Sequence, residues 1–262
     1  MGRFGFLIFL AVIQGLTEFL PVSSSGHLVL IQSFYRGFFQ PGALFDGILH
    51  LGTLLAVIVA FWKDVVRLIR VFFKWDRKDP YFRVIWLIMT GSVPAAIVGL
   101  GWKDQIEALF NSTSSLFPGW LFTGVILILS DFFRREKKEM KDITYLDALI
   151  IGTFQALALV PGISRSGSTI ASGIFLGLKG SVAATFSFLL SLPAVGGAGL
   201  LELRHVEEIS HSMLLEYVVA GLVAFVVGVF SIKILLRVIR SRSLKWFGIY
   251  CLILSLLTLL LR

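Results

Sequence analysis

Long apolar stretches alternate with short polar segments along the whole chain. Most of these stretches are close to the roughly 20 residues that a helix needs to cross the hydrocarbon core of a bilayer. Because lipid offers no hydrogen-bond partners to the backbone, such stretches must form helices or be buried among helices. The pattern therefore predicts an all-α, polytopic membrane protein. The apolar stretches lie near residues 4–22, 44–62, 84–102, 117–133, 144–160, 170–178, 183–203, 214–239 and 246–261.

The composition supports this fold class. Of 262 residues, 56% are hydrophobic and only 15% are charged, and the mean hydropathy is +0.88, which excludes an ordinary soluble domain. The single cysteine, Cys251, excludes a disulfide within the chain and a cysteine-based metal site. The first apolar stretch contains Gln14 and Glu18 and lacks a small-residue cleavage site, so it is not a cleavable signal. We interpret residues 1–262 as a single integral membrane domain.

The net charge of +8 comes mainly from short loops beside the apolar stretches. This placement favours contact with anionic lipid headgroups over binding of nucleic acid. The loops 103–116 and 204–213 contain one basic residue each. The positive-inside rule therefore puts these two loops outside and the basic loops in the cytoplasm. Three loops are rich in lysine and arginine: Lys63 to Arg83, Arg134 to Lys141, and Arg240 to Lys245, the last with Lys233 and Arg237 just before it.

This orientation accounts for six transmembrane helices that cross alternately inward and outward. The two remaining segments, roughly 4–39 and 144–178, must each return to the side from which they start. Each contains a polar interruption rich in serine and glycine, so we predict two re-entrant helix hairpins, the first entering from outside and the second from the cytoplasm. The six predicted spans are 44–62, 84–102, 117–133, 183–203, 214–239 and 246–261.

The two predicted hairpins also resemble each other. Three spans follow each hairpin, and an odd number of spans inverts the second copy relative to the first. We therefore predict an inverted repeat of about 1–140 and about 141–262, an arrangement known best from transporters. The alternative is a chance similarity between two turns rich in serine and glycine. A shift of 141 residues aligns Gln14 with Gln155, Leu16 with Leu157, Val22 with Ile163, Ser23 with Ser164, Ser25 with Ser166, and Gly26 with Gly167.

The second interruption, residues 161–169, has the sequence Pro-Gly-Ile-Ser-Arg-Ser-Gly-Ser-Thr. Its proline and glycine break a helix, and the residues after Arg165 are predicted to open a new one with free N–H groups. Free N–H groups, hydroxyls and one guanidinium together suit an anion, above all phosphate. The alternative is a turn whose arginine extends to the lipid headgroups. The candidate phosphate ligands here are Gly162, Ser164, Ser166 and Thr169, beside Arg165.

The first interruption contributes the other candidate groups. Gln14 and Glu18 are four residues apart and share one helix face, and a carboxylate inside an apolar stretch is a functional hypothesis by default. The following Pro21–His27 segment has three serines, and His27 is three residues from Ser24, within reach as a general base or acid. The alternatives are a carboxylate near the surface and a structural histidine. Ser23 and Ser25 join the candidate phosphate ligands.

If the repeat brings the two interruptions together, Glu18, Ser24 and His27 face Arg165, and the set has the parts needed for phosphoryl transfer. Glu18, with Gln14 as a weaker second ligand, is also a candidate to hold a divalent cation that bridges two phosphates. Outside this set, Asp46 and His50 are four residues apart in the 44–62 span. They are either a pair supporting the site or a hydrogen bond at a helix start.

Taken together, these motifs resemble those of the bacterial undecaprenyl-diphosphate phosphatase family associated with bacitracin resistance. The resemblance extends, through the pattern of spans, over essentially the whole chain. Gln14 stands where many members have a first glutamate, which weakens a mechanism with two carboxylates on the metal. The matching motifs are Gln14-Gly-Leu-Thr-Glu18, Pro-Val-Ser-Ser-Ser-Gly-His27 and Pro161-Gly-x-Ser-Arg-Ser-x-x-Thr169.

The resemblance implies removal of the terminal phosphate from a C55 prenyl diphosphate, which yields the monophosphate carrier of peptidoglycan synthesis. It also implies dependence on Mg²⁺ or Ca²⁺, a place in the bacterial plasma membrane, and an active site on the outer side. Carried over residue by residue, it makes Glu18, His27 and Arg165 essential and Ser24 the candidate nucleophile, with Ser164 and Thr169 binding phosphate.

Several alternatives stay open at this stage. Within a phosphatase, an activated water could replace Ser24 as the attacking group. A lipid-phosphate flippase or transporter would use the same inverted-repeat site without cleavage, but carriage alone needs no nucleophile. A purely structural membrane protein leaves Glu18 and Arg165 without a purpose. The expected partners are a long-chain prenyl diphosphate and membrane lipids, and a homodimer stays open because the sequence does not fix the oligomeric state.

Overall fold

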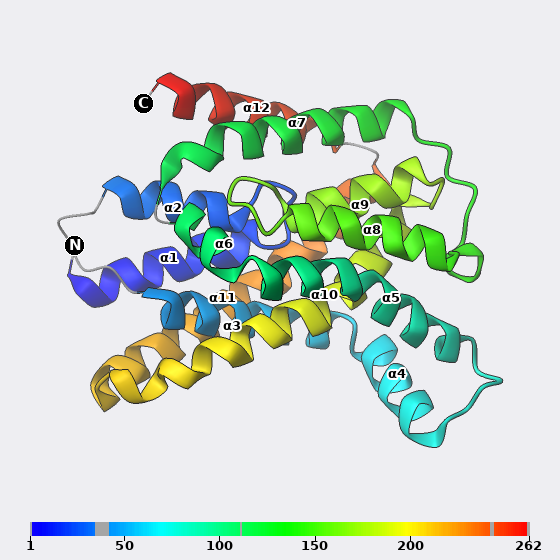
Figure 1. The fold of residues 1–262 in the computed structure, drawn as a ribbon, viewed down its shortest axis with the longest axis horizontal. Coiled ribbons are helices and arrows are strands. Elements are labelled where there is room, and N and C mark those ends of the chain that lie inside the picture. The colour runs from blue at the N-terminus through cyan, green and yellow to red at the C-terminus, as the bar shows by residue number, and fades with distance from the viewer. Residues whose placement is uncertain (1, 35–41, 111, 242–243, 261–262) are drawn as a thin grey trace.

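The computed structural model describes residues 2–34, 42–110, 112–241 and 244–260. The described residues form helices and one isolated β-bridge, without a strand, as the all-α prediction requires. Figure 1 shows most helices lying side by side along the long axis of the molecule. The helices are α1 (Arg3–Thr17), α2 (Ser24–Phe34), α3 (Gly42–Ala60), α4 (Trp62–Lys74), α5 (Pro80–Gly101), α6 (Lys103–Phe110), η1 (Thr113–Ser115), α7 (Leu116–Phe132), η2 (Met140–Asp142), α8 (Tyr145–Leu157), α9 (Arg165–Phe175), α10 (Gly180–Glu202), η3 (Leu203–Glu208), α11 (His211–Arg240) and α12 (Lys245–Leu260).

Five helices of the described chain are long and apolar enough to cross a membrane: α3, α5, α7 with η1, α10 with η3, and α11. They correspond to five of the six predicted spans. The sixth corresponds to α12, which has 16 described residues and is about 24 Å long at 1.5 Å per residue. Residue 261 of that span and residues 35–39 of the first hairpin lie outside the described residues.

The basic segment 63–83 was expected to be a loop, and this expectation is wrong for its first half. Residues Trp62–Lys74 form α4, whose buried residues Val65, Leu68 and Val71 recur every third position and therefore share one face. Its lysines and arginines are spread over the remaining surface. The same amphipathic spacing predicts a helix, so the charges alone were a poor guide.

Both predicted hairpins are present as pairs of short helices with an irregular break between them. The helices α1, α2, α8 and α9 have 15, 11, 13 and 11 residues, so none is long enough to cross a bilayer. The first break contains Ser23 in the left-handed region at φ 67°, and the second contains Gly162 at φ 93°. Figure 1 shows α1 and α8 approaching from opposite ends, so that the two breaks meet near the middle of the molecule.

The packing of the two halves follows the exchange expected of an inverted repeat. Helix α1 packs on α11 while its counterpart α8 packs on α5, and α3 packs on α11 while α10 packs on α5. Because α3 and α10 are counterparts of each other, exchanging the two halves leaves their contact unchanged, and the same holds for the contact between α7 and α12. This agrees with an inverted repeat, whereas its boundary near residue 140 stays a prediction.

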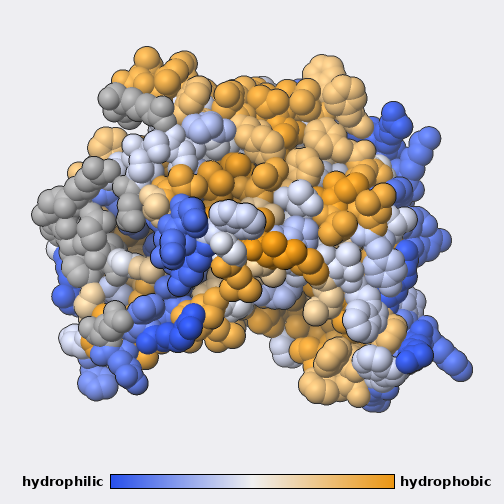
Figure 2. Space-filling view, in the orientation of Figure 1, coloured by the Kyte–Doolittle hydropathy of each residue, from blue (hydrophilic) through white to orange (hydrophobic). Residues whose placement is uncertain are grey.

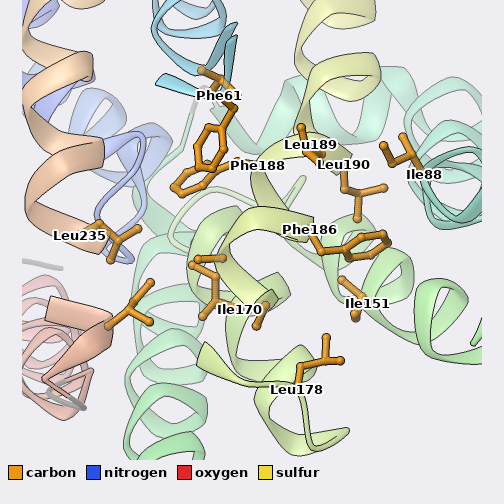
Figure 3. Packing of buried hydrophobic residues seen from close by; sticks show 14 of the residues in the cluster. Phe61, Ile88, Ile151, Ile170, Leu178, Phe186, Phe188, Leu189, Leu190 and Leu235 are labelled. Carbon is orange, nitrogen blue, oxygen red and sulfur yellow. The ribbon is translucent and has the colours of Figure 1, made fainter. Parts of the chain in front are cut away.

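A large apolar cluster holds the second hairpin against α10. Phe186 and Phe188 of α10 are fully buried in a cluster with Ile151 of α8, Ile170 of α9 and Phe61, which lies between α3 and α4, as Figure 3 shows. Because α9 and α10 share this core, the break before α9 is fixed relative to the spans.

The three basic loops lie at the same end of the molecule, as the positive-inside assignment requires. The Arg83 guanidinium donates to the carbonyl of Ile143 at 2.6 Å, and the Arg134 guanidinium donates to the carbonyl of Ile239 at 3.0 Å. Figure 2 shows hydrophilic residues at this end, on the right of the view, and an apolar band across the middle. This distribution suits a molecule that spans a bilayer.

Candidate active site

A buried carboxylate joins the two hairpin breaks. Glu18 lies at the end of α1 and is 8% exposed. Its Oε1 accepts a hydrogen bond from Arg165 Nη2 at 2.6 Å, and its Oε2 accepts one from Ser24 Oγ at 2.6 Å. Glu18 and Ser24 belong to the first hairpin and Arg165 to the second. The structure thus brings together three of the four residues that the sequence analysis assigned to catalysis.

Serine caps hold the two breaks in register. Ser23 Oγ accepts from the N–H of Gly26 at 3.2 Å and from the N–H of Gly162 at 3.1 Å, across the hairpin junction. Ser164 Oγ accepts from the N–H of Gly167 at 3.1 Å and caps α9. Side-chain caps satisfy N–H groups that a helix start leaves free. They fix where Ser24 and Arg165, the residues that follow, begin their helices.

The Glu18–Arg165 ion pair lies in a nearly dry environment. The arginine side chain is only 15% exposed, and a buried pair is tolerated when further hydrogen bonds satisfy both ions. Gln14 Nε2 donates to Glu18 Oε2 at 3.0 Å, and His50 Nε2 lies 3.8 Å from the same oxygen. Among the described residues, Arg165 Nη1 and Gln14 Oε1 are buried without a hydrogen-bond partner. The site therefore has one donor for an anion and one acceptor for a cation or a donor.

His27 has partners that the sequence did not predict. Its Nδ1 lies 2.7 Å from the carbonyl of Ser23, and its Nε2 lies 2.7 Å from the hydroxyl of Tyr250. Because a carbonyl only accepts, Nδ1 carries the proton in the neutral ring and Nε2 accepts from Tyr250. The expected partner Ser24 donates to Glu18 instead. In this structure Glu18, and not His27, is therefore the base in contact with the Ser24 hydroxyl.

The remaining candidate phosphate ligands bind one another or the backbone. Ser25 Oγ lies 3.3 Å from Ser23 Oγ, and Ser166 Oγ lies 3.2 Å from Ser164 Oγ. The Thr169 hydroxyl lies 2.6 Å from Ser187 Oγ of α10 and donates to the carbonyl of Arg165 at 2.8 Å. In this structure these hydroxyls are therefore engaged in structural hydrogen bonds.

A narrow cleft between α3 and α10 opens beside the ion pair. Glu18 and Arg165 form part of its wall, and the rest is mainly apolar. The polar pair is therefore bordered by apolar side chains of α3 and α10, and the cleft itself is too narrow to hold a water molecule. The other lining residues are Phe19, Thr53, Leu54, Val57, Ser191 and Val195.

Three residues were missed or left open by the sequence analysis. Tyr250 is 223 residues from His27 in the chain, and Thr123 of α7 binds the second break by accepting from the N–H of Ser164 at 2.9 Å. Neither has a local sequence signal. His50 Nδ1 bonds to the main-chain carbonyl of Asp46 at 2.7 Å, and its Nε2 lies 3.8 Å from Glu18 Oε2. A role of the Asp46 and His50 pair in supporting the site stays a prediction.

The fold and this site define a class: polytopic helical membrane proteins with two opposed re-entrant hairpins and a buried polar site at their junction. The chain belongs to the bacitracin resistance protein BacA family, whose model matches residues 7–257. It is 42% identical to an undecaprenyl-diphosphatase of Methanosphaera stadtmanae, with 97% of this chain and 96% of the relative covered. It is 41% identical to an undecaprenyl-diphosphatase of Carboxydothermus hydrogenoformans, with 100% and 98% covered.

Proposed function

We propose that this protein is a membrane-embedded phosphatase that hydrolyses undecaprenyl diphosphate to undecaprenyl phosphate and inorganic phosphate. This reaction would regenerate the lipid carrier for cell-wall synthesis. The names of the related proteins support the substrate. The observation that carries the reaction is the buried Glu18 carboxylate, which contacts both a hydroxyl, from Ser24, and a guanidinium, from Arg165.

In the proposed mechanism Ser24 Oγ attacks the terminal phosphorus in line with the bridging oxygen. The serine proton passes to Glu18 Oε2, its present hydrogen-bond acceptor at 2.6 Å. The unpartnered Nη1 of Arg165 would bind an oxygen of the transferred phosphoryl group and stabilise its charge. Undecaprenyl phosphate leaves as the bond to the bridging oxygen breaks.

A water molecule then attacks the phosphoserine, which releases inorganic phosphate and returns the proton to Ser24. His27, which is held by Ser23 and Tyr250, would take up at Nε2, the ring nitrogen without a proton, the proton that the attacking water loses. The rival within this mechanism is direct attack by a water that Glu18 activates, with Ser24 only orienting it.

The residues present fit a divalent cation only in part. The described residues contain no group of three or more His, Cys, Asp and Glu side chains that could hold a metal ion. Both oxygens of Glu18 already accept hydrogen bonds, whereas Gln14 Oε1 is buried and unpartnered. We propose that Glu18 and Gln14 hold Mg²⁺ or Ca²⁺ only together with oxygens of the diphosphate. A bound cation would neutralise charge on the two phosphates.

We further propose that the prenyl chain lies against the apolar side chains of α3 and α10 that border the cleft, with the diphosphate at the Glu18–Arg165 pair. The apolar lining of the cleft supports this orientation. We place the active site toward the outer side of the membrane. In support, α1 and α2 enter from the end opposite to the basic loops, and basic loops are typical of the cytoplasmic side.

The experiment that tests the proposed function measures phosphate release from a long-chain prenyl diphosphate by the purified full-length protein in detergent. We expect release with Mg²⁺ and its loss after addition of EDTA. Arg165→Ala should abolish release while the protein still inserts and elutes as the wild type does. Arg70→Ala, at an exposed position of α4, is the control and should stay active. Wild-type release by Arg165→Ala would contradict the mechanism, and no release by folded wild-type protein would favour the flippase.

A further inference from the structure

A second cavity lies at the end of the molecule that carries the basic loops. Its volume is about 470 Å³, and none of its lining residues belongs to the cleft at Glu18. The loop between α7 and α8, the start of α10 and the end of α11 all contribute to its wall. Most of its lining side chains are charged: Arg134, Arg135, Glu136, Lys179 and Arg240, beside Ser181.

The cavity is built on a buried arginine. The side chain of Arg134 is 4% exposed, and it donates from Nε to Glu136 Oε1 at 2.8 Å and from Nη2 to the carbonyl of Ile239 at 3.0 Å. A Cβ atom on Gly180 would lie 2.0 Å from Arg134 Nη2, so only glycine leaves room for the guanidinium there. The N–H of Gly180 also donates to Glu136 Oε1, at 3.1 Å.

The loop before the cavity is fixed by backbone hydrogen bonds. The N–H groups of Lys137 and Lys138 both donate to the carbonyl of Gly177, at 2.9 and 2.8 Å, and the N–H of Lys179 donates to the carbonyl of Lys138 at 3.0 Å. The loop and the start of α10 are therefore joined by hydrogen bonds, which hold in place the backbone near the arginines of the loop.

The charges at the cavity do not balance. Arg134 is paired with Asp131 at 3.5 Å and with Glu136, and Lys179 is paired with Glu139. Arg135 and Arg240 have no carboxylate partner among the described residues. The two unpaired arginines leave the cavity positive.

Hydrogen-bond donors without partners at this cavity indicate that it suits a negatively charged ligand. Arg134 Nη1 is buried and makes no hydrogen bond in the described chain, and its nearest carboxylate oxygen, Asp131 Oδ1, lies 3.5 Å away. The 23-residue helix α10 has no side-chain cap, and the N–H groups of Ser181 and Val182 in its first turn have no partner among the described residues. A helix start with free N–H groups attracts anions. Guanidinium groups and free N–H groups together match the oxygens of a phosphate.

We propose that this cavity binds a phosphate group, supplied by the headgroup of an anionic phospholipid at the membrane surface. Phe132 and Phe133, which immediately precede Arg134, are 84% and 63% exposed. Exposed aromatic rings beside basic residues are typical of the membrane interface, and basic pockets between helices bind anionic headgroups there. Free inorganic phosphate has the same binding chemistry but would not need these rings.

The test measures lipid binding to the purified full-length protein by native mass spectrometry, with phosphatidylglycerol, phosphatidylcholine and inorganic phosphate as separate probes. The cavity variant is Arg135→Gln with Arg240→Gln. The control is Arg70→Gln with Arg77→Gln, which removes two exposed arginines at the same end of the molecule. Wild type should prefer phosphatidylglycerol, and the cavity variant should lose at least about tenfold in affinity while the control retains it.

Other outcomes also decide the proposal. Variant-sensitive binding of inorganic phosphate without a preference for phosphatidylglycerol would support the phosphate site and assign it to the free ion. Equal affinities of the two double variants would overturn the proposal. If the cavity variant does not fold, the double variant Arg135→Lys with Arg240→Lys is measured instead. Loss of the forked guanidinium geometry should weaken lipid binding by at least about threefold. Unchanged binding by the lysine pair would then overturn the proposal.

Discussion

The two re-entrant hairpins have the same backbone plan. In the first, Ser23 Oγ accepts from the N–H three residues ahead at 3.2 Å and lies 3.3 Å from Ser25 Oγ. In the second, Ser164 Oγ accepts from the N–H three residues ahead at 3.1 Å and lies 3.2 Å from Ser166 Oγ. Because the caps and their neighbouring serines correspond, the repeat is present in hydrogen-bond geometry as well as in sequence.

The chemistry of the two hairpins differs where the backbones correspond. The shift of 141 residues places Leu159 at the position of Glu18, Arg165 at that of Ser24, and Ser168 at that of His27. One copy therefore has the carboxylate, hydroxyl and imidazole, and the other has the guanidinium. Duplication supplies two similar helix starts that face each other, and divergence makes one of them a base and nucleophile and the other an anion clamp. Neither hairpin contains the proposed site alone.

The largest effect should come from removing the charge that joins the hairpins. We expect Glu18→Gln to lower phosphate release by at least about 10³-fold, since it removes the proposed base. It should also lower the free energy of unfolding by about 3 kcal/mol, because Arg165 is left as a buried charge without its carboxylate. Phosphate release and denaturant unfolding in detergent measure the two effects.

Leu159→Gln is the matched control for this variant, since it places the same side chain at the corresponding position of the second hairpin. Leu159 is partly buried. The partners of the Glu18 carboxylate among the described residues are Gln14, Ser24, His50 and Arg165, and Leu159 is not one of them. We expect its phosphate release to stay within about threefold of wild type. Similar losses for both variants would refute the division of roles between the hairpins.

The next effect separates the two candidate attacking groups. If Ser24 is the nucleophile, Ser24→Ala should lower kcat by at least about 10³-fold, as removal of a serine nucleophile does. If water attacks, only the hydrogen bond to Glu18 is lost, and about tenfold is the upper limit. Ser25→Ala, which removes the neighbouring hydroxyl, should stay near wild type. Single-turnover measurements of phosphate release distinguish these outcomes.

Much of this comparison was accessible from the sequence because its signals are local. The breaks were predicted from residues with a stated conformational effect, such as Pro161 and Gly162, inside apolar stretches. The inversion followed from counting spans, and the meeting of Glu18 with Arg165 followed from the inversion. These steps need only hydrophobic pattern, helix breakers and the position of polar residues.

The missed features depend on contacts between distant segments. Nothing near Tyr250 or Thr123 in the chain marks them as partners of the breaks. His27 was expected to serve Ser24 because the two are three residues apart. Helix α2 instead turns the imidazole toward α12, where the Tyr250 hydroxyl donates a hydrogen bond to His27 Nε2. Packing decides which of several nearby groups a polar side chain bonds to. The spacing of residues along the chain does not reveal this packing.

A third effect tests whether both hairpins depend on close backbone approach. A Cβ atom on Gly152 of α8 would lie 2.0 Å from the carbonyl oxygen of Gly91, and one on Gly15 of α1 would lie 2.8 Å from that of Ala224. We expect Gly152→Ala to lower the free energy of unfolding by about 3 kcal/mol and Gly15→Ala by about 1–2 kcal/mol. Thermal unfolding in detergent measures both.

Gly197 of α10 is the control for these two variants, because a Cβ atom there would meet nothing within 4 Å. Gly197→Ala should stabilise the helix slightly, by up to about 1 kcal/mol, since alanine is the better helix former. A destabilisation by Gly152→Ala no larger than that of Gly15→Ala would contradict the closer approach assigned to the second hairpin.

The smallest effect distinguishes the two serine caps. Replacing a helix cap by alanine costs about 0.5–2 kcal/mol, and Ser164→Ala should fall near the middle of this range. Ser23→Ala should cost more, at about 2 kcal/mol, because it also leaves the N–H of Gly162 in the opposite hairpin without its acceptor. Denaturant unfolding of the two variants gives the difference directly. Equal losses of stability would mean that each cap serves only its own helix. A larger loss for Ser23→Ala would identify Ser23 as the cap that joins the two hairpins and thereby holds Glu18 against Arg165.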